Sequence, residues 1–139
     1  MSPSSNPSLD GLKVLIVDDD NDNLQFLAFL FETYGAIVTA VISAHDAFQV
    51  FLEQQPDILI SDIRMPDQDG HTLIRQIRGL TVGQGGQVPA IALTANAREI
   101  DQQRSIASGF QQHLAKPVEQ DMLLQAVLEL TSNKVQYQG

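Results

Sequence analysis

The chain has 139 residues, 43% of them hydrophobic and 18% charged, and it contains no cysteine. This length suits one domain that buries roughly two-thirds of its unfolded surface, and the lack of cysteine excludes disulfides and thiolate metal sites. Seventeen acidic and eight basic residues give a formal net charge of −9 without a basic run. That balance opposes binding to nucleic acid or to an anionic membrane surface.

The two ends of the chain differ in composition from its middle. Residues 1–10 are rich in Ser, Pro and Asn, which predicts a flexible lead-in without the charged start and apolar centre of a signal peptide. The folded domain is expected over residues 11–132, with a C-terminal tail over 133–139. Since no segment approaches the roughly 20 apolar residues of a membrane span, we expect a cytoplasmic protein.

Three acidic residues separate the first predicted strand from the first predicted helix. Residues 13–17 (Lys-Val-Leu-Ile-Val) are typical of a strand buried on both faces, and Asp18-Asp19-Asp20 follow directly. The spacing of leucines predicts a helix from about residue 21 to the glycine at 35, with Asp20 or Asn21 as its N-cap. On this helix Phe29 falls nearly opposite the apolar face, and Phe26 lies on its flank.

Three further strands are expected. Residues 37–42 form the second, and Thr39 within it indicates an edge position. Residues 58–60 form the third, which leads into Asp62 and a Pro/Asp/Gly turn. Residues 89–93 form the fourth, which ends in Thr94. The helices between them are expected after Ser43 and over residues 73–80, and a glycine-rich surface loop over 83–87.

The fourth helix is thinly apolar. It is expected to begin at Asn96, with Glu99 as in a capping box, and Ile100, Ile106 and Ala107 give it only sparse apolar anchoring, which suits a movable element. A short fifth strand over residues 113–115 then ends in Lys116-Pro117, and a fifth helix carries leucines up to Leu130. Strands that alternate with helices in this way predict a parallel sheet covered by helices on both faces.

Parallel strands bring their carboxyl ends to one edge of the sheet, where ligands bind in open α/β folds. That edge would hold the acids after the first strand, Asp62, Thr94 and Lys116. Clustered carboxylates repel one another unless a hard cation such as Mg²⁺ lies among them. An amine and a hydroxyl suit the oxygens of a transferred phosphoryl group, and a carboxylate can be its nucleophilic acceptor.

These motifs resemble the receiver domain of two-component response regulators from about Gly11 to Thr131. The matching segments are Val17-Asp18-Asp19-Asp20, Ser61-Asp62-Ile63-Arg64-Met65-Pro66-Asp67-Gln68-Asp69-Gly70, Leu93-Thr94-Ala95 and Lys116-Pro117. The resemblance implies a flavodoxin-like, doubly wound five-stranded sheet in the order 2-1-3-4-5.

The resemblance also implies a role for each motif residue. Asp62 resembles the phosphoacceptor. A Mg²⁺ or Mn²⁺ ion would be held by Asp62, by Asp19 directly, by Asp18 through water and by the backbone carbonyl of Arg64. Lys116 would pair with the phosphoryl oxygens, and Thr94 would move to hydrogen-bond them. The Lys116–Pro117 bond is expected to be cis, which is cheap only before proline.

Two positions depart from the family's best-known pattern. The switch position three residues before the lysine is usually Tyr or Phe, and here it is His113. Its imidazole titrates near neutrality, so a role as switch and a purely structural role both stay open. Arg64, two residues after the acceptor, is a long cation at a position that influences the lifetime of the acyl phosphate.

The resemblance implies a signalling module and not an enzyme with turnover. Its phosphodonor would be the phosphohistidine of a histidine kinase or phosphotransfer protein, docked near Phe29 and Phe26. Phosphorylation would switch the surface formed by the fourth helix, fifth strand and fifth helix, which could also form a homodimer. The chain would be a stand-alone receiver or part of a larger protein such as a hybrid kinase. Its further partner would be an output domain.

Other interpretations fit the residues less well. A calcium loop that starts at Asp18 would need Gly and Glu where Asn23 and Phe29 stand. A haloacid dehalogenase-type phosphatase needs Thr or Val after its Asp-x-Asp motif and a cap for its substrate. A pseudo-receiver that only binds partners is disfavoured by the complete acid, hydroxyl and lysine set. His45 and His71 are isolated in the sequence and are expected at the surface.

Overall fold

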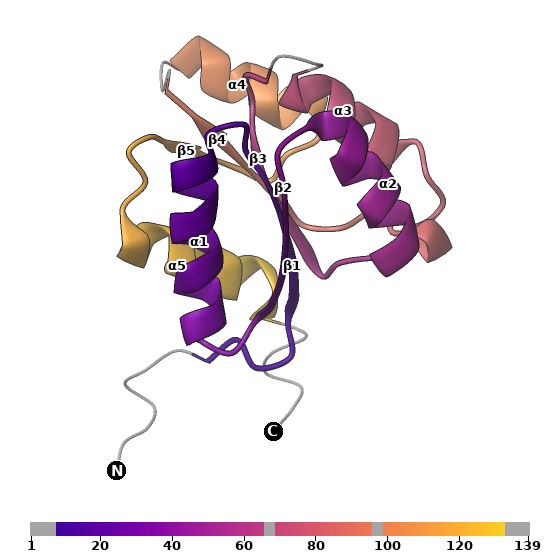
Figure 1. Cartoon of the computed structure of the whole chain (residues 1–139). Helices are drawn as coiled ribbons and strands as arrows, with labels where there is room; N and C mark the ends of the chain where they lie inside the picture. The colour runs from indigo at the N-terminus through magenta and orange to yellow at the C-terminus, as the bar shows by residue number, and fades with distance from the viewer. Residues whose placement is uncertain (1–7, 66–68, 96–98, 133–139) are drawn as a thin grey trace.

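The computed structural model describes residues 8–65, 69–95 and 99–132, without the side chains of 99–102. Five parallel strands form one sheet in the order β2-β1-β3-β4-β5, with helices on both faces (Figure 1). The predicted doubly wound architecture and strand order are confirmed. The elements are β1 (Lys13–Val17), α1 (Asn21–Thr33), β2 (Ile37–Val41), α2 (Ala44–Gln54), β3 (Ile58–Asp62), α3 (Gly70–Arg78), the 3₁₀ helix η2 (Val82–Gln84), β4 (Ala90–Thr94), α4 (Glu99–Ser108), β5 (Gln112–Ala115) and α5 (Gln120–Leu130).

The central strands explain the continuous apolar runs of the sequence. Every residue of β3 and β4 is buried, because helices cover both faces of the sheet. Alternate side chains enter two separate cores. One core lies under α1 and α5 and contains Ile16 and Ile60, and the other lies under α2 and α3 and contains Leu15 and Leu59. Buried on both sides, β1 and β3 hold the residues at their carboxyl ends rigidly.

The second strand lies at one edge of the sheet, as Thr39 indicated. It pairs only with β1, and none of its five residues is fully buried. The N-terminal boundary of the fold, in contrast, lies before residue 11. Leu9 is completely buried in the core beside α1, and its N–H donates to the carbonyl of Tyr34 at 2.8 Å. The expected flexible lead-in is therefore wrong at Leu9, where an apolar side chain reaches the core. The other expected terminal segments, 1–7 and 133–139, lie outside the described residues.

Side-chain caps fix the start of three helices. Asp20 accepts hydrogen bonds from the backbone N–H groups of Asp22 and Asn23 at the start of α1. Ser43 caps α2, and Asp69 caps α3. These bonds satisfy donors that have no partner inside the helix.

The apolar anchoring expected from Ile106 and Ala107 of α4 is absent from the described side chains of this helix. Ile106 is 45% exposed and Ala107 is exposed, whereas Ser105 and Ser108 are buried. The reason is that the inward face of this helix is polar and finds polar partners on α3 and β5. Asn96 lies outside the described residues, as do the side chains of Glu99 and Ile100. None of the helices within the described ranges is long and apolar enough to span a membrane.

Candidate functional site

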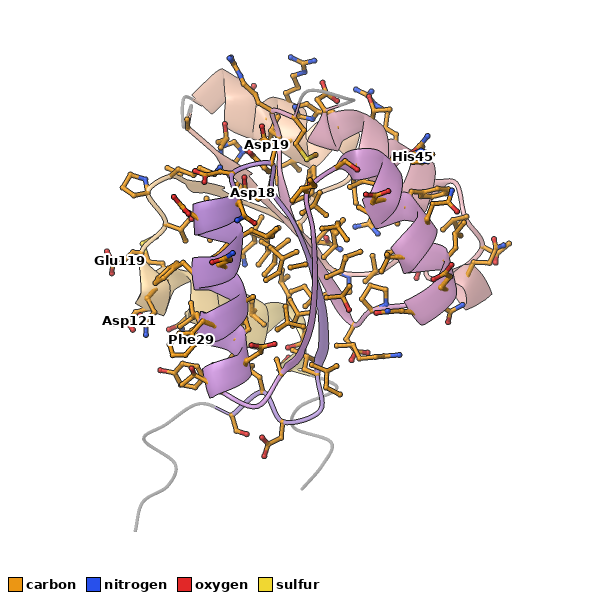
Figure 2. All side chains as sticks on the ribbon, in the orientation of Figure 1. Asp18, Asp19, Phe29, His45, Glu119 and Asp121 are labelled. Carbon is orange, nitrogen blue, oxygen red and sulfur yellow. The ribbon has the colours of Figure 1, made fainter. Side chains whose placement is uncertain are left out.

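Three carboxylates meet at the carboxyl ends of β1 and β3. Oxygen atoms of Asp18, Asp19 and Asp62 all lie within 4.8 Å of one another. The two strands are neighbours in parallel register, with Val17 opposite Ser61, so the residues that follow come together at one edge. Figure 2 shows Asp18 and Asp19 above α1, at this edge of the sheet. Within the described part of the chain, this is the one cluster of acidic and histidine side chains with the geometry to hold a metal ion.

Asp18 is the buried, hydrogen-bonded acid of the cluster. Its carboxylate is completely buried and accepts from the Asn23 side chain at 2.6 Å and from the backbone N–H of Asp20 at 2.9 Å. Asp62 is also buried, with 6% of its surface exposed, whereas Asp19 is exposed to solvent. Two acids are thus fixed by the fold, and the third is accessible from solution.

Lys116 joins the two buried acids. Its Nζ lies 3.1 Å from Asp62 Oδ2 and 3.2 Å from Asp18 Oδ2, although Lys116 is 98 residues away from Asp18 in the sequence. The predicted cis bond between Lys116 and Pro117 is present. The backbone N–H of Lys116 donates to the carbonyl of Thr94 at 2.7 Å, which ties the ends of β4 and β5 together.

Burial and charge act in opposite directions on this pair. Burial and the neighbouring carboxylate of Asp18 raise the pKa of Asp62 despite the attraction of Lys116. Burial also disfavours the ammonium of Lys116, but the charges of Asp62 and Asp18 outweigh it and raise the pKa of Lys116. A positive charge shared by two carboxylates leaves the cluster with excess negative charge, which favours a cation among the three acids.

The loop after Asp62 returns closely to the strand from which it came. Gly70 donates its N–H to the carbonyl of Ile63 at 2.7 Å, and a Cβ atom at Gly70 would lie 2.5 Å from the carbonyl oxygen of Asp62. Only glycine fits at such a separation. The side chain of Arg64 is exposed, and the predicted metal-binding role of its carbonyl stays a prediction.

The two predicted switch residues lie on neighbouring strands beside the acids. Thr94 is buried at the end of β4, one position past Leu93, which is the register partner of Asp62. His113 is partly buried on β5, and its Nδ1 lies 3.0 Å from Ser105 Oγ on α4. The roles of both residues in signalling stay predictions.

The expected surface position of His71 is wrong. Its side chain is only 4% exposed, and its Nδ1 lies 2.9 Å from Ser108 Oγ of α4. The sequence shows an isolated histidine, whereas the fold packs the first turn of α3 against α4. His45 is exposed on α2, as expected (Figure 2).

The two aromatic residues expected to meet a partner lie on the outer side of α1. Phe29 is 71% exposed and Phe26 is 48% exposed. Figure 2 shows Phe29 pointing away from the sheet, on the side of the molecule where Glu119 and Asp121 also lie. Their exposure agrees with the prediction, and docking there stays a prediction.

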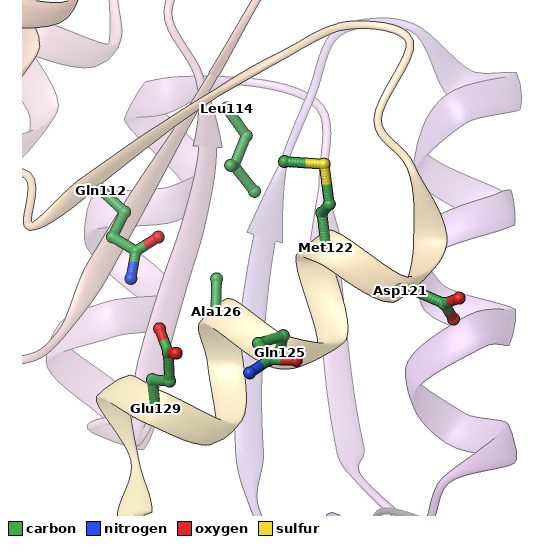
Figure 3. A pocket seen from close by; sticks show the side chains of 7 residues that line it. All are labelled: Gln112, Leu114, Asp121, Met122, Gln125, Ala126 and Glu129. Carbon is green, nitrogen blue, oxygen red and sulfur yellow. The ribbon is translucent and has the colours of Figure 1, made fainter.

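Two hollows lie near β5. The smaller one, of about 120 Å³, is lined in part by Arg64, Thr94 and His113. The larger one, of about 340 Å³, lies between β5 and α5, where Leu114 and Met122 supply apolar surface (Figure 3). None of the residues lining either hollow belongs to the acid cluster.

Comparison with known proteins accounts for this arrangement. Residues 14–128 match the family model of the response regulator receiver domain. The chain belongs to this receiver family. An uncharacterized 14.6 kDa protein of Leptolyngbya boryana is 43% identical over 116 residues, which cover 84% of this chain and 87% of that protein.

Other relatives contain a receiver domain within a longer chain. The sensor histidine kinase RcsC of Salmonella typhimurium is 35% identical over 120 residues, which cover 86% of this receiver domain but 12% of the kinase. The sensor histidine kinase GacS of Pseudomonas protegens is 33% identical, with 91% of this chain and 14% of the kinase covered. The receiver domain thus spans a small fraction of the kinases that it matches.

Solved structures agree with the fold of this receiver domain. The receiver domain of a Francisella response regulator is 28% identical with a TM-score of 0.81, and the match covers 89% of this chain and 99% of that one. The receiver domain of a sensor histidine kinase from Pseudomonas aeruginosa is 30% identical with a TM-score of 0.80, and the match covers 88% of this chain and 98% of that one. That structure has a magnesium ion coordinated in its active-site cleft.

Proposed function

We propose that this receiver domain accepts a phosphoryl group on Asp62 from the phosphohistidine of a histidine kinase or a phosphotransfer protein. The observation that carries the proposal is the ammonium of Lys116, 3.1 Å from Asp62 at the edge where three carboxylates meet. A carboxylate oxygen of Asp62 attacks phosphorus and forms the acyl phosphate. The P–N bond to the donor imidazole breaks, and the imidazole leaves with the bonding electrons and takes up a proton.

The donor set fits a hard divalent cation. Three carboxylates with oxygens within 4.8 Å of one another, one of them exposed, are ligands of the kind that Mg²⁺ or Mn²⁺ prefers. Asp19 and Asp62 would hold the ion directly, Asp18 through water, and Arg64 through its backbone carbonyl. The bound ion would neutralise charge on the acids and on the phosphoryl oxygens.

Lys116 and Thr94 serve the phosphorylated form. Lys116 exchanges its contact with the Asp62 carboxylate for contact with phosphoryl oxygens, so its charge stays neutralised. Thr94, at the end of the neighbouring strand, turns its hydroxyl toward the same oxygens. Helix α4 is the next element of the chain after Thr94, and the movement of Thr94 alters the surface formed by α4, β5 and α5.

The receiver is a switch that acts in the cytoplasm and not an enzyme with turnover. It promotes its own phosphorylation and slow dephosphorylation, and the changed surface meets an output domain, a hybrid kinase or a second copy. The similarity to the receiver domains of histidine kinases supports such partners. The exposed Phe29 and Phe26, on the helix that begins at the acid edge, suit contact with the donor.

The proposal is tested by incubating the protein with acetyl phosphate and Mg²⁺ and measuring the intact mass. We expect one phosphate adduct in the wild type and in Asp57→Asn, which alters an acid just before the opposite end of β3. We expect none in Asp62→Asn or after chelation of the metal. An adduct that persists in Asp62→Asn would refute the assignment, and sustained turnover of a phosphate ester would refute the distinction from an enzyme.

A further inference from the structure

Over its described side chains, residues 103–108, helix α4 faces the domain with two serines that form hydrogen bonds. Ser105 and Ser108, one turn apart, are buried on its inner face, while Ile106 between them points to solvent. His113 of β5 contacts Ser105, and His71 of α3 contacts Ser108. Hydrogen bonds are directional, so they fix the position of a helix more narrowly than apolar contacts of the same area.

The direction of the His71–Ser108 bond follows from a second contact. The Ser108 hydroxyl donates to the backbone carbonyl of Arg104 at 2.9 Å. Its oxygen is then left to accept, so the Nδ1–H of His71 is the donor in the 2.9 Å contact between the two side chains. Burial, followed by the charge of Arg104, lowers the pKa of His71, which favours the neutral ring.

The residue after α4 is held by the same neighbouring helix. The guanidinium of Arg78 donates from Nε and Nη2 to the carbonyl of Gly109, at 3.0 and 2.8 Å, and from Nη1 to the carbonyl of Gly86 at 3.0 Å. A Cβ atom at Gly109, whose φ is +128°, would lie 2.9 Å from Cγ of Arg78. His71 and Arg78, near the two ends of α3, therefore both hold the C-terminal end of α4.

The contact between His71 and α4 is linked to the acid cluster through Gly70, the residue before His71. His71 follows Gly70, which packs directly against the carbonyl oxygen of Asp62. The start of α3 is thereby fixed relative to Asp62, and His71 transmits that fixed position to Ser108. The opposite end of α4 follows the segment after Thr94 and is the end that a displacement of Thr94 reaches first.

We propose that His71 and Arg78 hold the C-terminal end of α4 as a fixed pivot, so that the switching movement takes place at its N-terminal end. His71 is a positioning residue: it acts on α4 and contacts none of the acids described in the cluster. The pivot itself concerns the unphosphorylated protein. The direction of movement rests on the proposed phosphorylation of Asp62.

Amide hydrogen exchange measured by mass spectrometry tests the pivot without phosphate. In His71→Leu and in Ser108→Ala we expect exchange at residues 105–109 to become about three- to tenfold faster, as for the loss of one buried hydrogen bond. The double variant should be no faster than the faster single variant, because both changes remove the same bond. His71→Asn, with an amide N–H in the place of Nδ1–H, should restore slow exchange, and His45→Leu on the exposed side of α2 should change nothing.

Unchanged exchange in both single variants would overturn the pivot. Equal acceleration in peptides from β1 and β3 would overturn it too, because His71 would then stabilise the whole fold and not this contact. The same holds if His71→Asn fails to restore slow exchange.

A second measurement, with acetyl phosphate and Mg²⁺, tests the direction of movement. In the wild type we expect phosphorylation to change exchange more at residues 99–103 than at residues 105–109. In Ser108→Ala we expect exchange to change at both ranges. A wild-type change centred on 105–109 would overturn the inference. If the wild type takes up no phosphate, the proposed function and the movement fail together, whereas the measurement without phosphate still decides the pivot.

Discussion

Asp62 occupies a position that disfavours its own charge. It is nearly excluded from solvent and lies in one cluster with Asp18, and the ammonium of Lys116 has to serve both carboxylates. A carboxylate in this position is poorly solvated and lies beside a cation that can follow a phosphoryl group. We therefore expect the arrangement that suits the proposed phosphoryl acceptor to reduce the stability of the unliganded fold.

Asp62→Asn is expected to raise the free energy of unfolding at pH 7 by about 1 kcal/mol, because it removes a buried, repelled charge. Burial raises the pKa of Asp62 in the folded protein above its ordinary value of 3.8. The folded state therefore takes up a proton more readily than the unfolded chain. The destabilisation by Asp62 is complete above the folded pKa and disappears as the pH falls toward 3.8.

Urea denaturation of the wild type and Asp62→Asn without divalent metal measures this difference. The two curves should converge as the pH approaches 3.8. The control is Asp19→Asn, which removes the exposed acid of the cluster and should stabilise less. A wild type more stable than Asp62→Asn at pH 7 would show that the attraction of Lys116 exceeds the cost of burial.

Single residues differed in how well the sequence predicted them. Asp62, Thr94 and Lys116 were recognisable because each lies at the carboxyl end of a strand, and parallel strands bring such positions together. His71 was not, because nothing in the surrounding sequence shows that a serine 37 residues later is its partner. Leu9 was missed for a similar reason, since its burial depends on contacts with α1 and not on its polar neighbours.

At the scale of elements, α3 depends on the close return of the chain to β3. The N-terminal residue of α3 is Gly70, and a methyl group there would overlap the carbonyl oxygen of Asp62 at 2.5 Å. The last residue of β3 and the first turn of α3 are therefore built as one unit. This unit orients both Asp62 and His71.

Gly70→Ala is expected to lower the free energy of unfolding by about 2 to 3 kcal/mol and to reduce phosphorylation of Asp62, because either β3 or α3 must shift. The matched control is Gly79→Ala at the other end of α3, where a Cβ atom would meet its nearest neighbour at an ordinary 3.4 Å. Chemical denaturation and the adduct yield with acetyl phosphate measure the two effects. Equal behaviour of the two variants would contradict the tight contact.

The helices show where sequence periodicity is sufficient and where it fails. Helix α1 buries Leu24, Leu27 and Leu30, as its spacing predicted, because it packs on an apolar sheet face. Helix α4 buries two serines because α3 and β5 provide histidines opposite them. A hydrophobicity scale predicts burial of Ile106 and not of the serines, because it contains no information about the surface that α4 packs against.

At the scale of the whole molecule, the sheet separates two apolar cores and collects negative charge at one rim. The strand order followed from the alternation of strands and helices together with the receiver motifs, and the two cores followed from alternate side chains of buried strands. The formal net charge of −9 includes the cluster of Asp18, Asp19 and Asp62 at that rim. Folding brings Asp62 to Asp18 and Asp19, and the repulsion between Asp62 and these two acids is a cost that the folded state bears, because unfolding separates Asp62 from them.

Mg²⁺ is therefore expected to stabilise the folded receiver by binding at this rim. At ten times its dissociation constant, an ion that binds only the folded state adds about 1.4 kcal/mol to the free energy of unfolding. Urea denaturation with Mg²⁺ and with NaCl at equal ionic strength separates binding from screening of the overall charge. Asp19→Asn removes an exposed ligand and should lose most of the gain, whereas Asp22→Asn, which removes a nearby acid of α1 outside the cluster, should keep it. If NaCl stabilises as much as Mg²⁺, or if both variants respond alike, the ion acts on the net charge of the molecule and not at the three carboxylates.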